Sequence, residues 1–289
     1  MRATILDGIT DEGSAGRPSR SADHLSDDAE TYASGTECFA AELHMLASPK
    51  LIHPNLIRCY GHGFRKLHDG RVQSFVALEL CSGMDLRVKM RRGGIDNPRV
   101  ERWALELATA LAHLHSVGVV HRDVKASNII IQDDEKLKLI DLGLAFWLPP
   151  GEQDFTELVT DFQISQRVGV PGYMPPEVFN CKPYGTAVDV FAYGALLHRL
   201  LWHALPPPSD IRCNAWVKDM LYSLAPCAYV TLVCTLGISP AWPPHLASIV
   251  RAASAISPEE RPTAATIVQQ LRSSGVDTSA VVAGEMTRR

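Results

Sequence analysis

The chain reads HRDVKASN at positions 121–128 and DLG at positions 141–143. Between them, the apolar runs III and LKLI flank the polar residues QDDEK. Short β-branched and aliphatic runs around a polar cluster predict an antiparallel hairpin. Asn128 enters the first strand of this hairpin and Asp141 leaves the second, so we expect both side chains at its open end.

Amide and carboxylate oxygens lying side by side suit Mg²⁺, which prefers oxygen ligands and commonly shares its coordination shell with phosphates. Asp123 lies five residues before Asn128, on the loop that leads into the hairpin. Its carboxylate can therefore face the same space. A carboxylate that orients a nucleophile beside a metal site is the arrangement that phosphoryl transfer requires.

Positions 121–128 resemble the catalytic loop of eukaryotic protein kinases, H-R-D-x-K-x-x-N, and positions 141–143 resemble their D-F-G motif with leucine for phenylalanine. Farther along, GYMPPE at 172–177 resembles the segment that ends in A-P-E, with proline for alanine. The motifs follow the order and spacing of that family. The resemblance implies an α+β, two-lobed protein-kinase-like fold, with an incomplete small β lobe and a mainly helical large lobe.

Composition and the resemblance together divide the 289 residues into four parts. Residues 1–35, rich in Asp, Ser, Gly and Ala and without periodicity, are expected to be flexible. We expect 36–81 to form a partial small lobe, 82–275 the large lobe, and 276–289 a loose tail. The region 209–240 fits the family less well and is interpreted as a variable insertion.

A helix around Glu42 and two strands are predicted for the small lobe. The pattern F-x-x-E-x-x-x-L followed by HPN resembles the mobile helix of the kinase small lobe, with Glu42 as its ion-pairing glutamate; the alternative is a solvated helix carboxylate. The strands run from Leu56 to Tyr60 and from Ser74 to Leu80, joined by a polar turn.

The second of these strands resembles the one that enters the kinase hinge, which implies the positions of nucleotide-binding residues. They are Glu42, Leu78, Glu79, Cys81, Asp85 and Ile130. By this resemblance Leu78 lies at the back of the nucleotide pocket, and backbone groups of Glu79 and Cys81 bond adenine. Asp85 lies near the ribose hydroxyls.

Two long helices are predicted in the large lobe. The first begins at Asn97-Pro98, with the asparagine as its cap and proline at its first position. The second runs from Ala187 to Leu201 and resembles the central kinase helix, in which an aspartate (here Asp189) bonds the backbone of the catalytic loop. The resemblance also pairs Arg261 with Glu177 in a largely buried ion pair.

Other charged groups in this lobe have simpler interpretations. The basic run Arg87–Arg92 is interpreted as a solvated helix face, with docking of an acidic peptide substrate as the alternative. His113 and His115 fall on different faces of the first long helix, which favours structural roles over a metal pair.

The family mechanism assigns a role to each residue of the motif. Asp123 orients the substrate hydroxyl and accepts its proton, while Asn128 and Asp141 hold Mg²⁺ on the phosphates of ATP. Lys125 steadies the transferring phosphoryl group, and a lysine at this position resembles serine/threonine kinases rather than tyrosine kinases. The resemblance thus implies transfer of the γ-phosphate of ATP to serine or threonine of protein substrates.

Arg122 leads to a hypothesis about regulation. An arginine beside the catalytic aspartate can anchor a phosphorylated activation loop through charge-assisted hydrogen bonds. Ser165, Thr160 and Thr156 are the candidate phosphorylation sites, and Ser165 has the best spacing before Glu177. The alternative is that all three are ordinary polar loop residues.

The sequence departs from the kinase pattern before the Glu42 helix. No G-x-G-x-x-G occurs there, and Lys50, the first lysine of the chain, follows Glu42. Arg2 could belong to a remnant of the strand that carries the kinase lysine, because Ala3–Leu6 is weakly strand-like. Val170 replaces a threonine that bonds the catalytic aspartate and lysine. Either the first strands of a kinase are missing, or the chain is a pseudokinase scaffold that binds partners.

Composition argues against several other classes of protein. The net charge of −4 provides no electrostatic footprint for nucleic acid, and the longest apolar stretch, Tyr229–Cys234, is too short to cross a bilayer. The first residues lack the apolar core of a signal peptide. Seven cysteines without a C-x-x-C pair predict free thiols in an intracellular, cytoplasmic setting, with Cys81 alone bordering a ligand.

Overall fold

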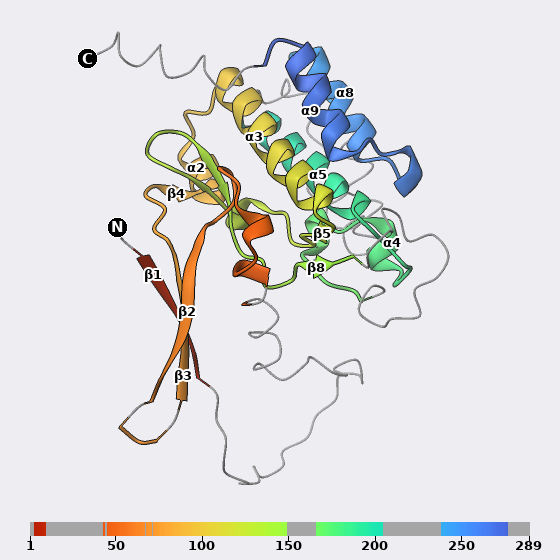
Figure 1. Cartoon of the computed structure of the whole chain (residues 1–289). Helices are drawn as coiled ribbons and strands as arrows, with labels where there is room; N and C mark the ends of the chain where they lie inside the picture. The colour runs from red at the N-terminus through yellow and green to blue at the C-terminus, as the bar shows by residue number, and fades with distance from the viewer. Residues whose placement is uncertain are drawn as a thin grey trace, which may run out of the picture. The chain divides into compact units, whose positions relative to one another are not determined.

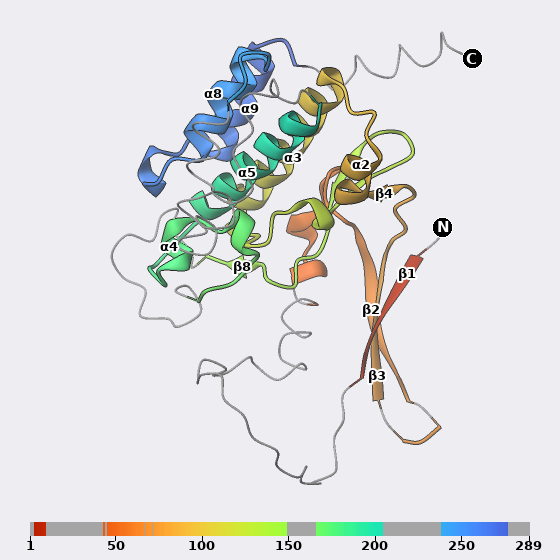
Figure 2. The same ribbon diagram turned by 180° about the vertical axis from the view of Figure 1, so that it is seen from behind.

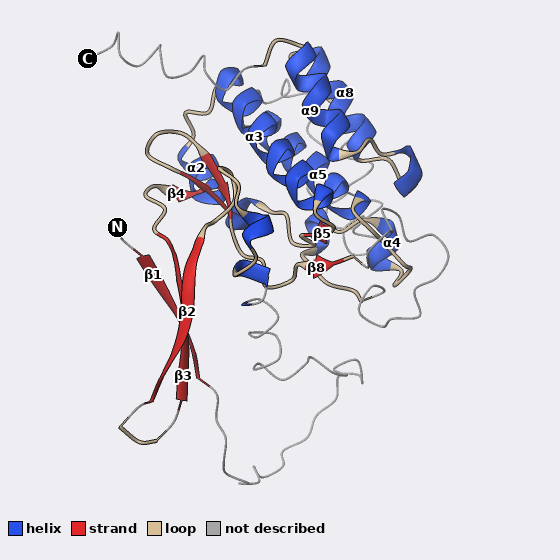
Figure 3. Ribbon diagram, viewed as in Figure 1, coloured by secondary structure: helices blue, strands red, loops and turns tan. Residues whose placement is uncertain are grey.

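The computed structural model describes residues 3–9, 43, 45–66, 68–70, 72–148, 166–204 and 238–276 (Figure 1). Contacts between residues divide the chain into two compact units, which meet in sequence between Leu80 and Cys81. The smaller unit contains the three longest strands, and the larger contains the long helices and several short strands (Figure 3). Lys50–Ile57 belongs to the larger unit although it lies before the last two strands of the smaller one.

The smaller unit is built on one antiparallel sheet. Its strands are β1 (Ala3–Ile9), β2 (Cys59–Lys66) and β3 (Val72–Glu79), in the order β1-β3-β2. β1 pairs along its whole length with β3, from Ala3 opposite Glu79 to Ile9 opposite Gln73. The prediction that residues 1–35 are flexible is therefore wrong for Ala3–Ile9, whose partner lies far away in the sequence. The rest of that segment lies outside the described residues.

The first predicted strand of this unit was misplaced. It was expected from Leu56 to Tyr60, whereas β2 begins at Cys59, and Leu56 makes a parallel bridge with Leu139 in the larger unit. β2 contains two glycines, Gly61 and Gly63. A Cβ atom at Gly63 would lie 2.6 Å from Cζ of Phe75, so a larger residue there would require the Phe75 ring to shift.

The larger unit contains helices, short 3₁₀ turns and short strands. Its helices are α2 (Leu86–Arg92), α3 (Asn97–Ser116), α4 (Pro176–Phe179), α5 (Ala187–Ala204), α8 (Pro244–Ala253) and α9 (Ala264–Ser273), with short 3₁₀ turns η1 (Pro49–Leu51), η2 (Ala126–Asn128), η4 (Pro171–Tyr173) and η6 (Pro258–Glu260). Its strands are β4 (Met84–Asp85), β5 (Val119–Val120), β6 (Ile129–Ile131), β7 (Leu137–Leu139) and β8 (Phe146–Trp147). β4, β6 and β7 form one small sheet, and β5 pairs with β8.

Helices α3 and α5 lie side by side at the centre of the larger unit, with α9 and α8 packed against them (Figure 2). α3 buries apolar residues at helical spacing: Val100, Trp103, Leu107, Leu111 and Leu114. Tyr193 of α5 donates a hydrogen bond to the carbonyl of Ala104, at 3.1 Å. Both helices lie where the sequence predicts them, although the cap of α3 is Asp96, which accepts from the Arg99 amide at 3.0 Å, and not Asn97.

The HPN sequence at 53–55 is anchored within the larger unit. The side-chain nitrogen Nδ2 of Asn55 donates to the carbonyl of Leu137 at 2.9 Å. The ring of His53 stacks on that of His113, with centroids 5.0 Å apart. Burial, together with the neighbouring charges of His113 and Lys138, lowers the pKa of His53 to about 4. His53 is therefore neutral near pH 7, and His113 has the structural role that its position on the helix predicts.

The predicted ion pair between Arg261 and Glu177 is confirmed. Nη1 of Arg261 lies 2.6 Å from Oε1 of Glu177, and Nη2 lies 2.9 Å from Oε2, a bidentate pair in which both residues are buried. The same guanidinium donates to the carbonyls of Ala255, Ile256 and Ala187. Arg261 thus ties α4, the start of α5 and the loop after α8 together.

Two terminal expectations have mixed outcomes. Val276, assigned to the loose tail, is buried, and its amide donates to the carbonyl of Leu271 at 3.1 Å, which closes α9. Residues 277–289 and most of the predicted insertion at 209–240 lie outside the described residues. Across the described ranges, no helix combines the length and apolarity that crossing a bilayer would require.

Candidate functional site

The predicted hairpin is present. β6 and β7 pair antiparallel, with Ile129 opposite Leu139, and the amide of Ile140 donates to the carbonyl of Asn128 at 2.9 Å. Asn128 and Asp141 therefore flank the last backbone hydrogen bond of the hairpin, at its open end. The local sequence favours this geometry because both strands are short aliphatic runs around a polar turn.

Asp123 is brought to the same end by direct contacts with its neighbours. Nδ2 of Asn128 donates to the backbone carbonyl of Asp123 at 3.0 Å and to its carboxylate Oδ2 at 2.8 Å. The ammonium of Lys125 forms an ion pair with the same oxygen. The Asp123 side chain is only 7% exposed, so this carboxylate is fixed in orientation. Val170, which cannot supply a hydroxyl, is 39% exposed.

Asp141 presents an exposed carboxylate on a left-handed backbone, with φ of 65°. Its Oδ1 accepts from the amide of Gly143 at 3.2 Å. Left-handed conformations are uncommon for residues other than glycine and cluster at functional sites. The conformation is a feature of this site that the sequence alone did not predict.

The donor set at the hairpin mouth fits a magnesium ion. Asn128 uses its amide nitrogen for both bonds to Asp123, so its amide oxygen remains for a cation. Within the described ranges, no three His, Cys, Asp or Glu side chains form a metal cluster. Magnesium bound together with phosphates needs only one or two protein carboxylates or amides, so two protein ligands are enough.

Asp189 holds the backbone of the catalytic loop, as predicted. Its two oxygens accept from the amides of His121 and Arg122, each at 2.8 Å, and Nε2 of His115 lies 2.9 Å from Oδ2. Burial by itself would raise the pKa of Asp189, but the hydrogen bond and charge of His115 and the neighbouring His121 lower it. Asp189 therefore stays ionised while almost fully buried, and Arg122 is held with φ of 64°.

Arg122 connects the catalytic loop with the segments that follow the hairpin. Its Nε donates to the carbonyl of Leu144, its Nη1 lies 3.3 Å from the hydroxyl of Tyr184, and its guanidinium lies 5.5 Å from the centre of the Phe146 ring. The candidate phosphorylation sites Ser165, Thr160 and Thr156 lie outside the described residues, so the regulatory role of Arg122 stays a prediction.

The residues predicted to contact nucleotide divide between the two units. Leu78 and Glu79 lie in β3, where the Glu79 amide donates to the carbonyl of Arg58 at 2.8 Å. Cys81 follows in the larger unit, and Asp85 and Ile130 lie opposite each other in the β4–β6 pair. Glu42 lies outside the described residues.

Asp85 has a structural role that was not predicted from the sequence. Its Oδ1 accepts from the amide of Val88 at 2.8 Å, so it is the N-cap of α2. An aspartate immediately before a helix is the signal that could have revealed this cap. The predicted solvated helix face over Arg87–Arg92 corresponds to α2.

A small pocket of about 20 Å³ lies beside Asp123, with room for roughly one water molecule. Its walls come from the loop before the hairpin, from two short stretches of 168–175, and from α4 to α5: Arg122, Asp123, Val124, Val168, Gly169, Val170, Tyr173, Met174, Pro175, Val178, Tyr184, Val188 and Ala192. Most of these side chains are apolar. A substrate group that binds to Asp123 would therefore lie beside a mainly apolar pocket.

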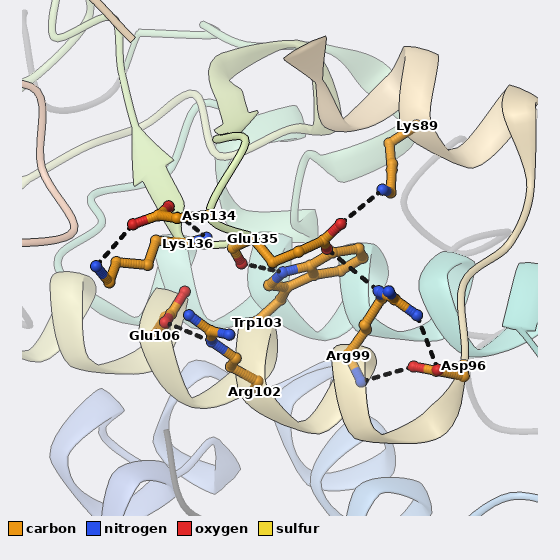
Figure 4. Close-up of polar contacts among 9 residues, drawn as sticks. All are labelled: Lys89, Asp96, Arg99, Arg102, Trp103, Glu106, Asp134, Glu135 and Lys136. Atoms are coloured by element: carbon orange, nitrogen blue, oxygen red, sulfur yellow. Dashed lines mark hydrogen bonds and ion pairs between the residues drawn. The ribbon is translucent and has the colours of Figure 1, made fainter. Parts of the chain in front are cut away.

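The turn of the hairpin is clamped to two helices at the end opposite Asp141. In Figure 4, Lys89 of α2 and Arg99 of α3 converge on the carboxylate of Glu135, at 3.0 Å and 3.2 Å. The indole nitrogen of Trp103 donates to the carbonyl of Glu135 at 2.9 Å. Since a hairpin of three residue pairs is weak by itself, these bonds help to fix its direction.

Glu106 of α3 also holds the hairpin. Its Oε2 accepts from the amide of Leu137 at 2.7 Å, and Nε of Arg102 lies 3.1 Å from its Oε1 (Figure 4). Burial raises the pKa of Glu106, although these bonds oppose the rise. The role of neither glutamate was predicted, because each joins the hairpin to a helix that is distant in the sequence.

Replacing Glu135 by glutamine should lower the free energy of unfolding by about 1–2 kcal/mol, since the carboxylate charge shared by Lys89 and Arg99 is lost and only one acceptor oxygen remains. Urea denaturation measures the change. Asp133→Asn is the matched control, because Asp133 is an exposed carboxylate in the same turn. Equal stability losses in the two variants would contradict the clamp.

Comparison with known proteins gives a consistent result. The sequence model of the family described as "Protein kinase domain" matches residues 24–271. The chain is 29% identical over 204 residues to Serine/threonine-protein kinase Nek6 of Oryza sativa subsp. japonica, covering 70% of this chain and 34% of the relative. It is 30% identical over 200 residues to Serine/threonine-protein kinase cds1 of Schizosaccharomyces pombe, covering 66% and 40%.

A third relative is CBL-interacting protein kinase 16 of Oryza sativa subsp. japonica, 32% identical over 155 residues, which is 53% of this chain and 31% of the relative. The chain thus spans well under half the length of these three curated relatives.

Proposed function

This chain belongs to the protein kinase family, and we propose that it is a serine/threonine kinase that transfers the γ-phosphate of ATP to hydroxyl groups of protein substrates. The observation that carries the proposal is the fixed carboxylate of Asp123, held by Asn128 and Lys125 at the open end of the hairpin. A buried, oriented carboxylate next to oxygen ligands for a metal ion supports phosphoryl transfer better than any other reaction class.

Each polar side chain of the site has a role in this proposal. Asp123 accepts the hydroxyl proton of the substrate, and Lys125 compensates the negative charge that develops on the transferring group. Asn128 and Asp141 would hold Mg²⁺ through their oxygens. When bound, this ion neutralises charge on the phosphates. Asp189 acts indirectly. It accepts hydrogen bonds from the amides of His121 and Arg122, and so fixes the backbone that leads to Asp123.

A second candidate is a pseudokinase scaffold that binds nucleotide without transferring phosphate. β1 carries the sequence ATILDGI, without lysine or arginine, and it pairs with β3, the strand expected to enter the hinge. The strand that would supply the phosphate-binding cation of a kinase therefore has none between Ala3 and Ile9. This observation favours weak or absent transfer, whereas the intact set at the hairpin mouth favours activity.

Thermal unfolding with and without Mg·ATP tests the metal site. Saturating ligand at about 100 times its dissociation constant should stabilise the chain by about 2.7 kcal/mol, which is a shift of several degrees in Tm. We expect Asp141→Asn to remove most of the shift and Asp133→Asn to leave it unchanged. An unchanged shift in Asp141→Asn would contradict the assignment of the metal ligand.

The setting of the protein is also part of the proposal. Cys59 and Cys181 are free thiols, which fits the reducing intracellular compartment that cysteine usage predicts. ATP and a protein substrate are the partners that the mechanism needs.

A further inference from the structure

The exposed charge of the segment 166–204, part of which lines the Asp123 pocket, has one sign. Between positions 166 and 204, the only acidic residues are Glu177 and Asp189, and both are buried and already bonded. Three residues of this segment are exposed and carry a positive charge: Arg167, Lys182 and Arg199. The exposed charge that this segment contributes is therefore positive.

Arg199 is held against the wall of the pocket. Its Nη1 donates to the hydroxyl of Tyr173 at 3.1 Å, and its Cζ lies 4.4 Å from the centre of the Tyr173 ring. Tyr173 lines the pocket together with Asp123. Gly172 gives the guanidinium room, because a Cβ atom there would lie 2.6 Å from Nη2. The cation is thus fixed by packing and does not move freely on its long side chain.

Arg167 provides a second fixed cation. Its Cζ lies 3.9 Å from the centre of the Phe179 ring, and the next residue, Val168, lines the pocket. Within the described ranges, no carboxylate forms an ion pair with Arg167 or Arg199. Two guanidinium groups held by aromatic rings and still exposed to solvent are suited to bind a carboxylate or phosphate.

We propose that Arg199 and Arg167 select substrates with an anionic side chain, either a carboxylate or a phosphate, close to the hydroxyl that receives the phosphoryl group. The inference rests on the proposed function, because that function places the hydroxyl at Asp123. Like-charge repulsion disfavours substrates with basic residues at these positions, so the same two arginines also exclude the wrong partners.

Peptide binding tests the inference without any need for catalysis. Fluorescence anisotropy of the full chain would compare four serine peptides of equal length, with flanking alanine, aspartate, phosphoserine or lysine. At low salt we expect the aspartate or phosphoserine peptide to bind about tenfold more tightly than the alanine peptide, and the lysine peptide to bind most weakly. The comparison between aspartate and phosphoserine separates the two sources of negative charge.

Charge reversal then identifies the residue. Arg199→Glu should remove the preference for anionic peptides, and Arg199→Ala should reduce it, which guards against misfolding of the first variant. Arg272→Glu is the control, since it makes the same charge change on the exposed face of α9, away from the pocket. The preference should also weaken as salt rises from 50 to about 500 mM, because exposed charges are screened.

The outcomes separate this inference from the proposed function. Tighter binding of anionic peptides that disappears in Arg199→Glu supports the inference even if no phosphate is transferred. Equal binding of all four peptides, or a preference that survives Arg199→Glu, overturns it even if the chain is an active kinase.

Discussion

Replacing Asp123 by asparagine should lower the rate of phosphoryl transfer by roughly 100- to 10,000-fold, the range typical of losing a general base. Asparagine has nearly the same shape but cannot accept the hydroxyl proton. Its side chain can still meet Asn128, which now contacts Oδ2 of Asp123 at 2.8 Å, and so the loop should keep its conformation. Initial rates of peptide phosphorylation, measured at saturating Mg·ATP, give the size of the loss.

The controls for this prediction separate chemistry from folding. The thermal shift produced by Mg·ATP should persist in Asp123→Asn, because the predicted metal ligands are Asn128 and Asp141. Asp133→Asn makes the same chemical change on an exposed turn and should retain full activity. Comparable transfer rates in Asp123→Asn and the wild-type chain would rule out Asp123 as the base.

Replacing Arg261 by methionine should lower the free energy of unfolding by about 3–5 kcal/mol, because Glu177 is then left buried without its partner. The guanidinium makes a bidentate pair with Glu177, at 2.6 Å and 2.9 Å, and bonds three backbone carbonyls as well. Methionine keeps much of the volume but supplies no donor. Urea or thermal denaturation of the full chain measures this change.

A double variant makes this second prediction sharper. Arg261→Met combined with Glu177→Leu removes both charges and should recover part of the lost stability, since an apolar pair carries no desolvation cost. Arg251→Met, an exposed arginine on α8, is the control and should change stability by less than about 0.5 kcal/mol. A loss below about 1 kcal/mol in Arg261→Met would show that the bridge contributes little.

Local patterns made the centre of the site predictable. The hairpin follows from two short aliphatic runs around a polar turn, and its pairing places Asn128 and Asp141 at one end. The bond of Asp189 to the loop and the pair between Arg261 and Glu177 came from the family resemblance, and the structure bears both out. In both contacts a buried charged group is bonded to a partner, as the cost of burying an unpaired charge requires.

Contacts between distant positions were not predictable in the same way. β1 is a strand because β3 offers it a complete edge, and no local signal in Ala3–Ile9 names that partner. Glu135 belonged to a polar turn in the sequence, yet its carboxylate joins α2 and α3. The position of the Arg199 charge on the surface could not be predicted from the sequence either, because it depends on where Tyr173 lies.

The most direct test of the proposed function is transfer of label from γ-labelled ATP to the four serine peptides described above by the purified chain. We expect label on serine in the presence of Mg²⁺, none after addition of EDTA, and none above background with Asp123→Asn. Binding of Mg·ATP by the wild-type chain without any transfer of label would contradict the kinase assignment and leave the scaffold as the function.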